Sequence, residues 1–326
     1  MYYWTVYLAS ELYRFFKKIN KQEILNTGNL DLLANKAVEG FITGLHKSPF
    51  HGFSVEFAEH RQYNVGESTR NIDWKLFGRT DKLYTKRFDE ETNLRCQIII
   101  DVSSSMQIEE KDSLSKLQYA IWSSAVFLQL LKKQRDASGI VYFDDSVIAS
   151  SKIASSSRHY KELTHQLETY LTYKSAQKTT DISETLHTIA AQIHKRSLVI
   201  LFTDFLEENR DIEKLFDAIK HLKHRKHEVI VFHTLHRSSE ISFEFGHSPV
   251  HFIDAESGES LKLQPNDIKA LYVERMKVYT SNLKSRFSQY KIDYVEADTS
   301  LPVESTFIPF LVKRRRMSRW GLKCLD

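Results

Sequence analysis

Apolar runs and helical periodicity alternate along the chain from about residue 93 onward. Runs rich in Ile, Val and Phe predict strands at 95–102, 138–145, 195–205, 227–235 and 291–298. Apolar residues spaced three and four apart predict helices between them, at 113–133, 158–172, 182–194, 211–224 and 265–290. Strands that are apolar throughout and alternate with such helices are typical of a mainly parallel sheet covered on both faces. The sequence therefore predicts an α/β fold over residues 93–312.

Shorter patterns fill in the rest of the chain. Residues 146–150 read as the return strand of a hairpin, and 241–245, 250–254 and 259–263 as three short antiparallel strands. Residues 30–43 have helical spacing, whereas 48–91 mix polar and aromatic residues without a regular period and are expected to be irregular. We expect three parts: a helical and irregular N-terminal part (1–92), the α/β domain (93–312) and a basic tail (313–326).

Charge separates the tail from the body of the protein. The chain of 326 residues has a net charge of +4 and is 41% hydrophobic, which excludes a disordered chain. Six Lys or Arg and one Asp lie between Lys313 and Asp326, so the remainder is close to neutral and is not predicted to bind nucleic acid. The cluster Lys313–Arg316 with Arg319 is either a solvated tail or a contact for an acidic partner, nucleic acid or anionic lipid.

Cysteine content and hydropathy bear on location. Cys96 falls in a predicted core strand and Cys324 in the tail, so no disulfide is expected and the prediction is a cytoplasmic protein. No apolar stretch reaches the ~20 residues of a membrane span. Residues 1–20 could form an amphipathic helix with Trp4, Leu8 and Phe15 on one face. This helix could touch a membrane surface, pack on the protein, or come from an upstream start codon.

Oxygen-bearing side chains follow two of the predicted strands. Asp101, Ser103 and Ser105 alternate directly after the first strand, and Asp204 follows the strand 195–205. Thr180 precedes the helix that starts near 182, and these loops meet at one edge if the sheet is doubly wound. Ser113 is expected to cap the next helix, so Ser103 and Ser105 are not needed for capping. Carboxylates and hydroxyls are hard ligands that suit Mg²⁺ or Mn²⁺.

This arrangement resembles the von Willebrand factor A domain over residues 93–312. The resemblance implies a Rossmann-type sheet and a metal-ion-dependent adhesion site. The implied metal ligands are Asp101, Ser103, Ser105, Thr180 and Asp204. It also implies an open coordination position that could accept a carboxylate from a partner or client protein.

A second set of residues lies before the first strand. The set comprises Gly52–Phe57, Arg61–Tyr63, Gly66, Arg70–Trp74, Gly78–Thr80 and Lys86–Glu91. It resembles the signature of a bacterial family, domain of unknown function 58, and the resemblance implies a MoxR-type AAA+ ATPase as partner. The candidate partner-binding or structural residues are Glu56, Arg61, Tyr63, Arg70, Asp73, Trp74, Arg79, Glu90 and Glu91. They form either an ion-pair network that fixes the segment or a docking surface.

These patterns favour a non-enzymatic, metal-dependent adaptor that works with an AAA+ ATPase. One alternative is a Mg²⁺-dependent phosphoryl-transfer enzyme that uses Asp101 and Asp204, although no phosphate-binding glycine loop accompanies them. Another is nucleic-acid binding through the tail, without sequence specificity. A zinc site on His221, His224 and His227 is not favoured, because neighbouring lysines repel a cation.

Overall fold

The structure is a computed structural model, and the chain falls into two compact units. Described are residues 24, 30–44, 57–64, 69, 72–88, 94–109, 113–174, 182–205, 212–224, 226–254, 258–307 and 309–311. The smaller unit is Phe50–Leu94, and the larger unit combines Met1–Pro49 with Arg95–Asp326. The predicted three-part division stays a prediction.

The larger unit is built on a six-stranded sheet in the order β10-β7-β6-β3-β4-β5. Its strands are β3 (Arg95–Asp101), β4 (Ala137–Phe143), β5 (Val147–Ser150), β6 (Leu198–Thr203), β7 (Glu228–Leu235) and β10 (Asp293–Asp298). All neighbours pair in parallel except β4 and β5. Counted along the chain, this is the doubly wound order 3-2-1-4-5-6, with an antiparallel edge strand. The predicted α/β fold with a mainly parallel sheet is confirmed.

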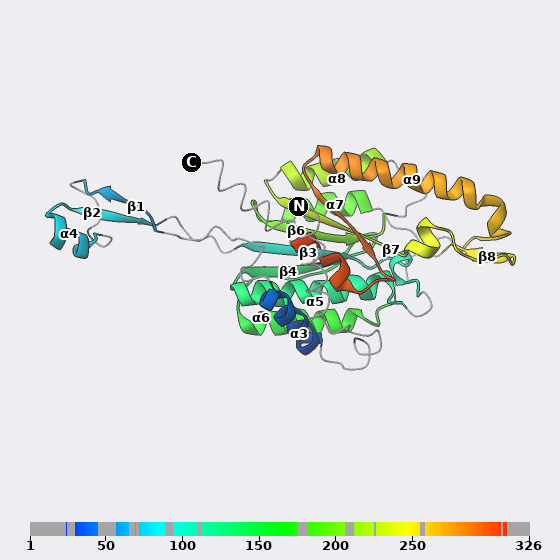
Figure 1. Cartoon of the computed structure of the whole chain (residues 1–326), viewed down its shortest axis with the longest axis horizontal. Coiled ribbons are helices and arrows are strands. Elements are labelled where there is room, and N and C mark those ends of the chain that lie inside the picture. The colour runs from blue at the N-terminus through cyan, green and yellow to red at the C-terminus, as the bar shows by residue number, and fades with distance from the viewer. Residues whose placement is uncertain are drawn as a thin grey trace. The chain divides into compact units, whose positions relative to one another are not determined.

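Helices cover both faces of the sheet (Figure 1). One face carries α5 (Lys116–Gln134) and α6 (Ser157–Tyr170), with α3 (Leu30–Gly44) packed on α5 and α6. The other face carries α7 (Ile182–Gln192), α8 (Ile212–His224) and α9 (Pro265–Gln289). All of these helices lie close to their predicted ranges.

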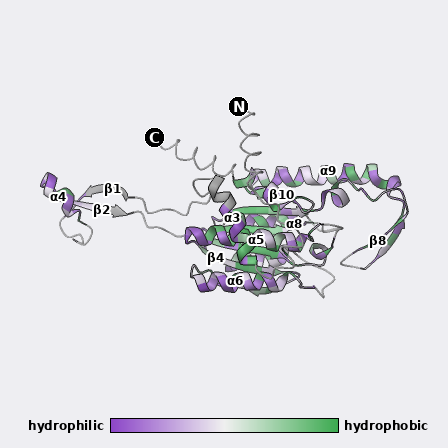
Figure 2. Cartoon of the chain, turned by 60° about the horizontal axis from the view of Figure 1, so that its bottom comes forward, coloured by the Kyte–Doolittle hydropathy of each residue, from purple (hydrophilic) through white to green (hydrophobic). Residues whose placement is uncertain are grey.

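Alternate residues of each central strand point to opposite faces, and both sets are buried. Ile99 and Leu201 pack with Leu186 and Phe216 from α7 and α8. Phe202 packs on the other face against Phe127 of α5, with ring centroids 6.5 Å apart. Figure 2 shows hydrophobic residues concentrated in the sheet and α5. Burial on both faces explains the uninterrupted apolar strands of the sequence. Cys96 is fully buried in β3, as predicted.

The start of α5 differs from the prediction. The helix begins at Lys116, and its N-cap is Ser115 instead of Ser113. The Ser115 hydroxyl accepts a hydrogen bond from the Gln118 amide, and the Gln118 side chain accepts one from the Ser115 amide. This reciprocal capping box satisfies two backbone donors at once, which a cap at Ser113 does not offer. The shift makes Lys116 the first residue of the helix.

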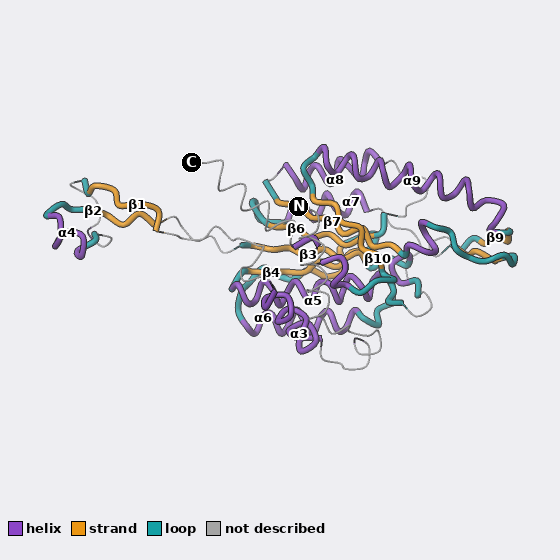
Figure 3. Tube along the Cα trace, viewed as in Figure 1, coloured by secondary structure: helices purple, strands orange, loops and turns teal. Residues whose placement is uncertain are grey.

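An insertion separates β7 from α9. It contains a π-helical turn, η3 (Arg237–Ile241), and the antiparallel hairpin of β8 (Val250–Ile253) and β9 (Ser260–Leu263), which extends beyond the sheet near the start of α9 (Figure 3). The two hairpin strands were predicted, but the strand predicted at 241–245 is wrong. Phe243 has a φ of 51° and stacks on Phe252, with centroids 5.6 Å apart. Aromatic clustering therefore replaces strand pairing there.

The smaller unit contains regular structure where an irregular segment was predicted. β1 (Phe57–Gln62) pairs with β2 (Tyr84–Phe88) in antiparallel fashion, and the short helix α4 (Trp74–Thr80) lies between them in the chain. β1 reads FAEHRQ, and this mixture of charged and apolar residues hides the two-residue period of a strand.

A membrane crossing needs a long apolar helix. No helix in the described part of the chain has both properties.

Candidate functional site

The predicted site lies where β3 and β6 run side by side. Within the sheet, β4 pairs with one edge of β3 and β6 pairs with its other edge, so the strand order reverses between β3 and β6. Ligands of doubly wound proteins bind beyond the carboxyl ends of the strands at such a reversal of strand order. Asp101 is the last residue of β3, and Asp204 directly follows the last residue of β6. The fold thus brings the two carboxylates, 103 positions apart in the numbering, to the same edge.

Asp101 is completely buried at this edge. Its Oδ1 accepts a hydrogen bond from the Ser103 amide at 3.0 Å, and its Oδ2 accepts one from the Thr203 hydroxyl at 2.7 Å. Burial, and then the negative charge of Asp204, raise the pKa of Asp101 to about 7, although the hydrogen bonds from Ser103 and Thr203 lower it. The carboxylate therefore lies where a positive charge would stabilise it.

Two hydroxyls face each other in the loop after Asp101. Ser103 Oγ and Ser105 Oγ are 3.1 Å apart. A single turn of 3-10 helix, η2 (Ser105–Gln107), shapes the loop, and the Gln107 side chain donates to the Val102 carbonyl at 2.7 Å. These contacts fix the shape of the loop that carries the two hydroxyls directly after Asp101.

Asp204 has a cationic partner that the sequence did not reveal. Its Oδ2 accepts from Lys116 Nζ at 2.6 Å, and the same ammonium donates to Glu240 Oε1 at 2.7 Å. Lys116 is only 3% exposed. Burial lowers the pKa of Lys116, but the charges of Asp204 and Glu240 outweigh burial and raise it overall. Lys116 is therefore charged in the folded protein.

His233 supports Asp204 from β7. Its Nε2 lies 2.7 Å from the Asp204 carbonyl oxygen, and its Nδ1 lies 2.6 Å from the Tyr294 hydroxyl. Burial lowers the pKa of His233 to about 4, so the ring is neutral at pH 7. Because a carbonyl only accepts, Nε2 carries the proton and Nδ1 accepts from Tyr294.

The residue after Asp204 is held in place as well. Phe205 adopts a left-handed φ of 52°, and its carbonyl accepts from the Tyr279 hydroxyl at 2.6 Å. A left-handed bulky residue is uncommon and is held here by its buried ring and this hydrogen bond.

A comparison with known families shows to which family the chain belongs. The family model described as "Protein of unknown function DUF58" matches residues 59–281. The chain belongs to the DUF58 family. This confirms the family resemblance seen in the sequence. No curated protein matches this DUF58 chain significantly.

Solved structures give weaker likenesses. The conserved hypothetical protein BatB from Bacteroides thetaiotaomicron is 17% identical, with 69% of this chain and 99% of that chain covered and a TM-score of 0.43. An aerotolerance-related membrane protein from Bacteroides fragilis is 16% identical, with 68% and 99% covered and a TM-score of 0.39. The PilB minor pilin from Streptococcus sanguinis is 12% identical, with 72% and 64% covered and a TM-score of 0.38. The fold assignment rests on the strand order and not on these scores.

The donor chemistry of this DUF58 site fits a hard divalent cation. Asp101 supplies a carboxylate without an ion-pair partner among the described residues, and Ser103 and Ser105 supply hydroxyl oxygens. Together, the four side chains Asp101, Asp204, Glu240 and Lys116 carry three negative charges and one positive charge. One divalent cation would balance them. No group of three or more His, Cys, Asp or Glu side chains that could hold a metal ion occurs in the described ranges.

The predicted ligand set is only partly visible. Asp101, Ser103, Ser105 and Asp204 lie at one edge, whereas Thr180 falls outside the described residues. Their role as metal ligands stays a prediction. Lys116, Glu240 and His233 were missed by sequence reasoning. The available signal was a lysine at the first turn of a helix, where the helix dipole favours acids.

The candidate residues of the smaller unit have individual roles. Glu56, Arg70, Glu90 and Glu91 lie outside the described residues, as does the side chain of Arg61. Asp73 caps α4 by accepting from the amides of Lys75 at 3.0 Å and Leu76 at 3.1 Å.

The remaining three differ in exposure. Tyr63 is half-buried, whereas Trp74 and Arg79 are exposed. Exposed side chains suit a docking surface better than a buried ion-pair network.

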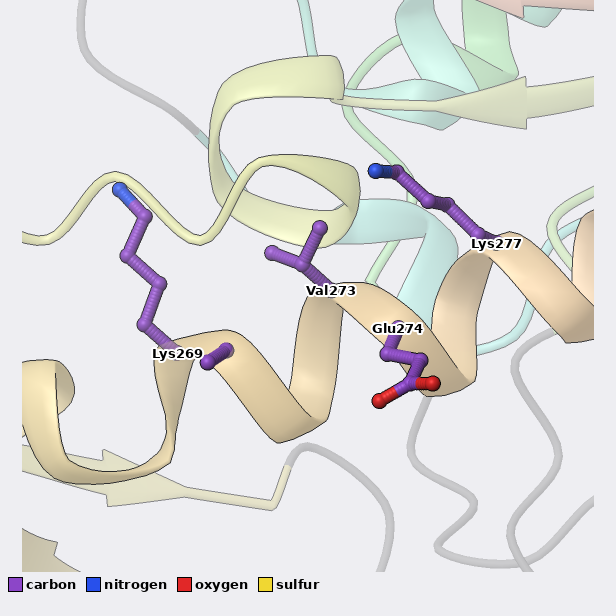
Figure 4. A pocket seen from close by; sticks show the side chains of 5 residues that line it. Lys269, Val273, Glu274 and Lys277 are labelled. Atoms are coloured by element: carbon purple, nitrogen blue, oxygen red, sulfur yellow. The ribbon is translucent and has the colours of Figure 1, made fainter.

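Two other features lie away from this edge. His221 faces His187, with their Nδ1 atoms 3.2 Å apart, while His227 Nδ1 accepts from the Ser197 amide, so these two histidines of the rejected zinc set have different partners. A shallow hollow on α9 is lined by Lys269, Ala270, Val273, Glu274 and Lys277. In Figure 4, Lys269, Val273 and Lys277 extend from one side of α9 and Glu274 from another. None of the lining residues belongs to the candidate metal set.

Proposed function

We propose that this DUF58 protein is a non-enzymatic adaptor that binds a partner carboxylate through Mg²⁺ or Mn²⁺ at the carboxyl edge of its sheet. The supporting observation is Asp101, a fully buried carboxylate with a raised pKa beside two converging hydroxyls. Burying a charge without compensation is costly, and a bound cation would remove that cost.

The residues at this edge would bind the metal ion in different ways. Asp101, Ser103 and Ser105 would hold the ion through oxygen atoms, with Thr180 as a further ligand. Asp204 would act chiefly through its charge, because Lys116 already holds one of its oxygens. When bound, the ion would supply an open coordination position for a carboxylate of the partner or client.

Binding is better supported than phosphoryl transfer. Phosphoryl transfer requires cationic groups directed at the phosphate oxygens. Lys116 is the buried cation at this edge in the described ranges, and its ammonium is held by both Asp204 and Glu240. The edge is therefore better arranged to receive a cation than a phosphate.

The partner and location follow from the family resemblance. We propose a MoxR-type AAA+ ATPase as partner and the cytoplasm as the compartment. The exposed Trp74 and Arg79 of the smaller unit are candidate contacts for that partner.

A Mn²⁺ titration tests the metal site. We expect saturable binding of Mn²⁺ to the wild-type protein. The binding is measured as the decrease in the electron paramagnetic resonance signal of free Mn²⁺. Binding should disappear in Asp101→Ala and persist in the control Asp217→Ala, which removes an exposed carboxylate of α8 that pairs with Lys220. Equal binding by wild type and Asp101→Ala would place the ion elsewhere.

A second measurement tests the adaptor role. Binding to the purified ATPase should require Mg²⁺, be lost in EDTA, and fail in Asp101→Ala. Metal-independent binding would instead assign the contact to the smaller unit.

A further inference from the structure

Lys116 joins three segments that are distant in sequence. It is the first residue of α5, its side chain is 4% exposed, and it contacts the end of β6 through Asp204 and the turn η3 through Glu240. Glu240 in turn accepts from the His236 amide at 2.8 Å through its second oxygen. The ammonium thus lies at the centre of a buried network at the carboxyl edge.

The position is electrostatically unfavourable for a lysine without partners. Burial removes the ammonium from water, and the N-terminus of α5 carries a partial positive charge. Two carboxylates at 2.6 Å and 2.7 Å offset both effects. Conversely, the ammonium places a positive charge against Asp204, the second buried carboxylate at this edge.

From this network we infer that Lys116 is a built-in cation, which keeps the acidic edge folded without metal and weakens divalent-ion binding by competing for Asp204. The inference rests on the proposed function, because it concerns regulation of the same site. Lys116 is a positioning residue, since it acts through Asp204 and not by touching the ion.

The consequence is a site that tolerates the loss of its metal. With Lys116 in place, the edge keeps one countercharge in the metal-free state. The bound ion therefore adds less stability than it would at a site with carboxylates alone, and a partner carboxylate contributes a larger share of the total affinity for the ion.

Two variants with opposite expected effects test this inference. Lys116→Met keeps roughly the length of the side chain and removes its positive charge from beside Asp204 and Glu240. Its Mn²⁺ affinity should rise at least about tenfold, because two charges a few ångströms apart interact strongly in a buried site. Its melting temperature should fall in EDTA and recover with Mg²⁺. Glu240→Gln leaves Lys116 to Asp204 alone, so its Mn²⁺ affinity should fall.

The control is Lys132→Met, which removes a lysine from the last turn of the same helix, where it pairs with Asp31. Its Mn²⁺ affinity should equal that of the wild type. A Lys116→Met protein that binds Mn²⁺ no more tightly than wild type overturns the inference and leaves the proposed function standing. If neither protein binds Mn²⁺, both fail. If Lys116→Met does not fold, the Glu240→Gln protein provides the test. Mn²⁺ binding by Glu240→Gln that is as tight as wild type, or tighter, overturns the inference.

Discussion

The ends of β3 and β6 present two buried aspartates to the same edge, but the protein compensates them differently. Asp101 accepts hydrogen bonds from an amide and a hydroxyl, whereas Asp204 is paired with the ammonium of Lys116. Their burial is almost the same, at 0% and 2% exposed. Burial alone therefore does not identify a metal ligand. The carboxylate that lacks a cationic partner is the one expected to attract the ion.

The largest expected effect comes from Asp204→Asn in metal-free protein. The substitution removes one of two partners of a buried ammonium, and breaking a buried pair costs about 3–5 kcal/mol of unfolding free energy. Denaturation in EDTA measures the loss. The control Asp217→Asn breaks an exposed pair with Lys220 and should cost far less, because water screens that pair. A loss below 1 kcal/mol at Asp204 would mean that the two aspartates are alike after all.

Asp101→Asn should raise the unfolding free energy relative to wild type as the pH increases, whereas Asp204→Asn should lower it. The folded-state pKa of Asp101 is about 7, above the unfolded value of about 3.9, so the folded wild type binds this proton more tightly. Wild-type stability from this group is therefore lost as the pH rises from about 4 to about 7. Asp101→Asn lacks this loss, so in EDTA its unfolding free energy relative to wild type should rise by roughly 2–4 kcal/mol between those two pH values.

His233 contributes a slope of the opposite sign in the same interval. Its folded pKa of about 4 lies below the unfolded value of about 6.5, so its contribution to stability is lost as the pH falls. Both proteins retain His233, and the difference between their unfolding free energies cancels its effect. If the difference in unfolding free energy between wild type and Asp101→Asn did not change with pH, the Asp101 carboxylate would be stabilised as well as that of Asp204.

A third carboxylate, in the smaller unit, serves as the reference and gives the smallest effect. Asp73 is satisfied by two backbone amides at the start of α4, so Asp73→Ala should destabilise this helix by about 1 kcal/mol. Amide exchange in α4 should then become roughly fivefold faster, with Lys82→Ala, an exposed side chain just beyond the helix, as the control. Unchanged exchange would indicate that the cap contributes nothing.

The sheet could be predicted from sequence because its signal is strong. β6 reads LVILFT and is buried at every position, so an uninterrupted apolar run could only be a central strand or a buried helix. The loops that follow β3 and β6 then placed Asp101 and Asp204 at one edge. The segment 241–245 shows where predicting a strand from alternating apolar residues fails. Its Phe residues pack in an aromatic cluster and do not form a strand.

Lys116 could not be predicted in the same way. Nothing within one helical turn of it in the sequence explains a buried lysine, because Asp204 and Glu240 are 88 and 124 positions away. Its orientation also depends on the helix beginning at residue 116, three residues later than expected. Long-range charge pairing of this kind is decided by tertiary structure.

The contacts of the site have a consequence for folding. Thr203 reaches Asp101 across 102 positions, and Lys116 reaches its two acids across 88 and 124. Contacts this distant in sequence form only after the entropy of closing long loops has been overcome, so they form late. A partner that recognises this edge would consequently bind only chains whose sheet has finished assembling.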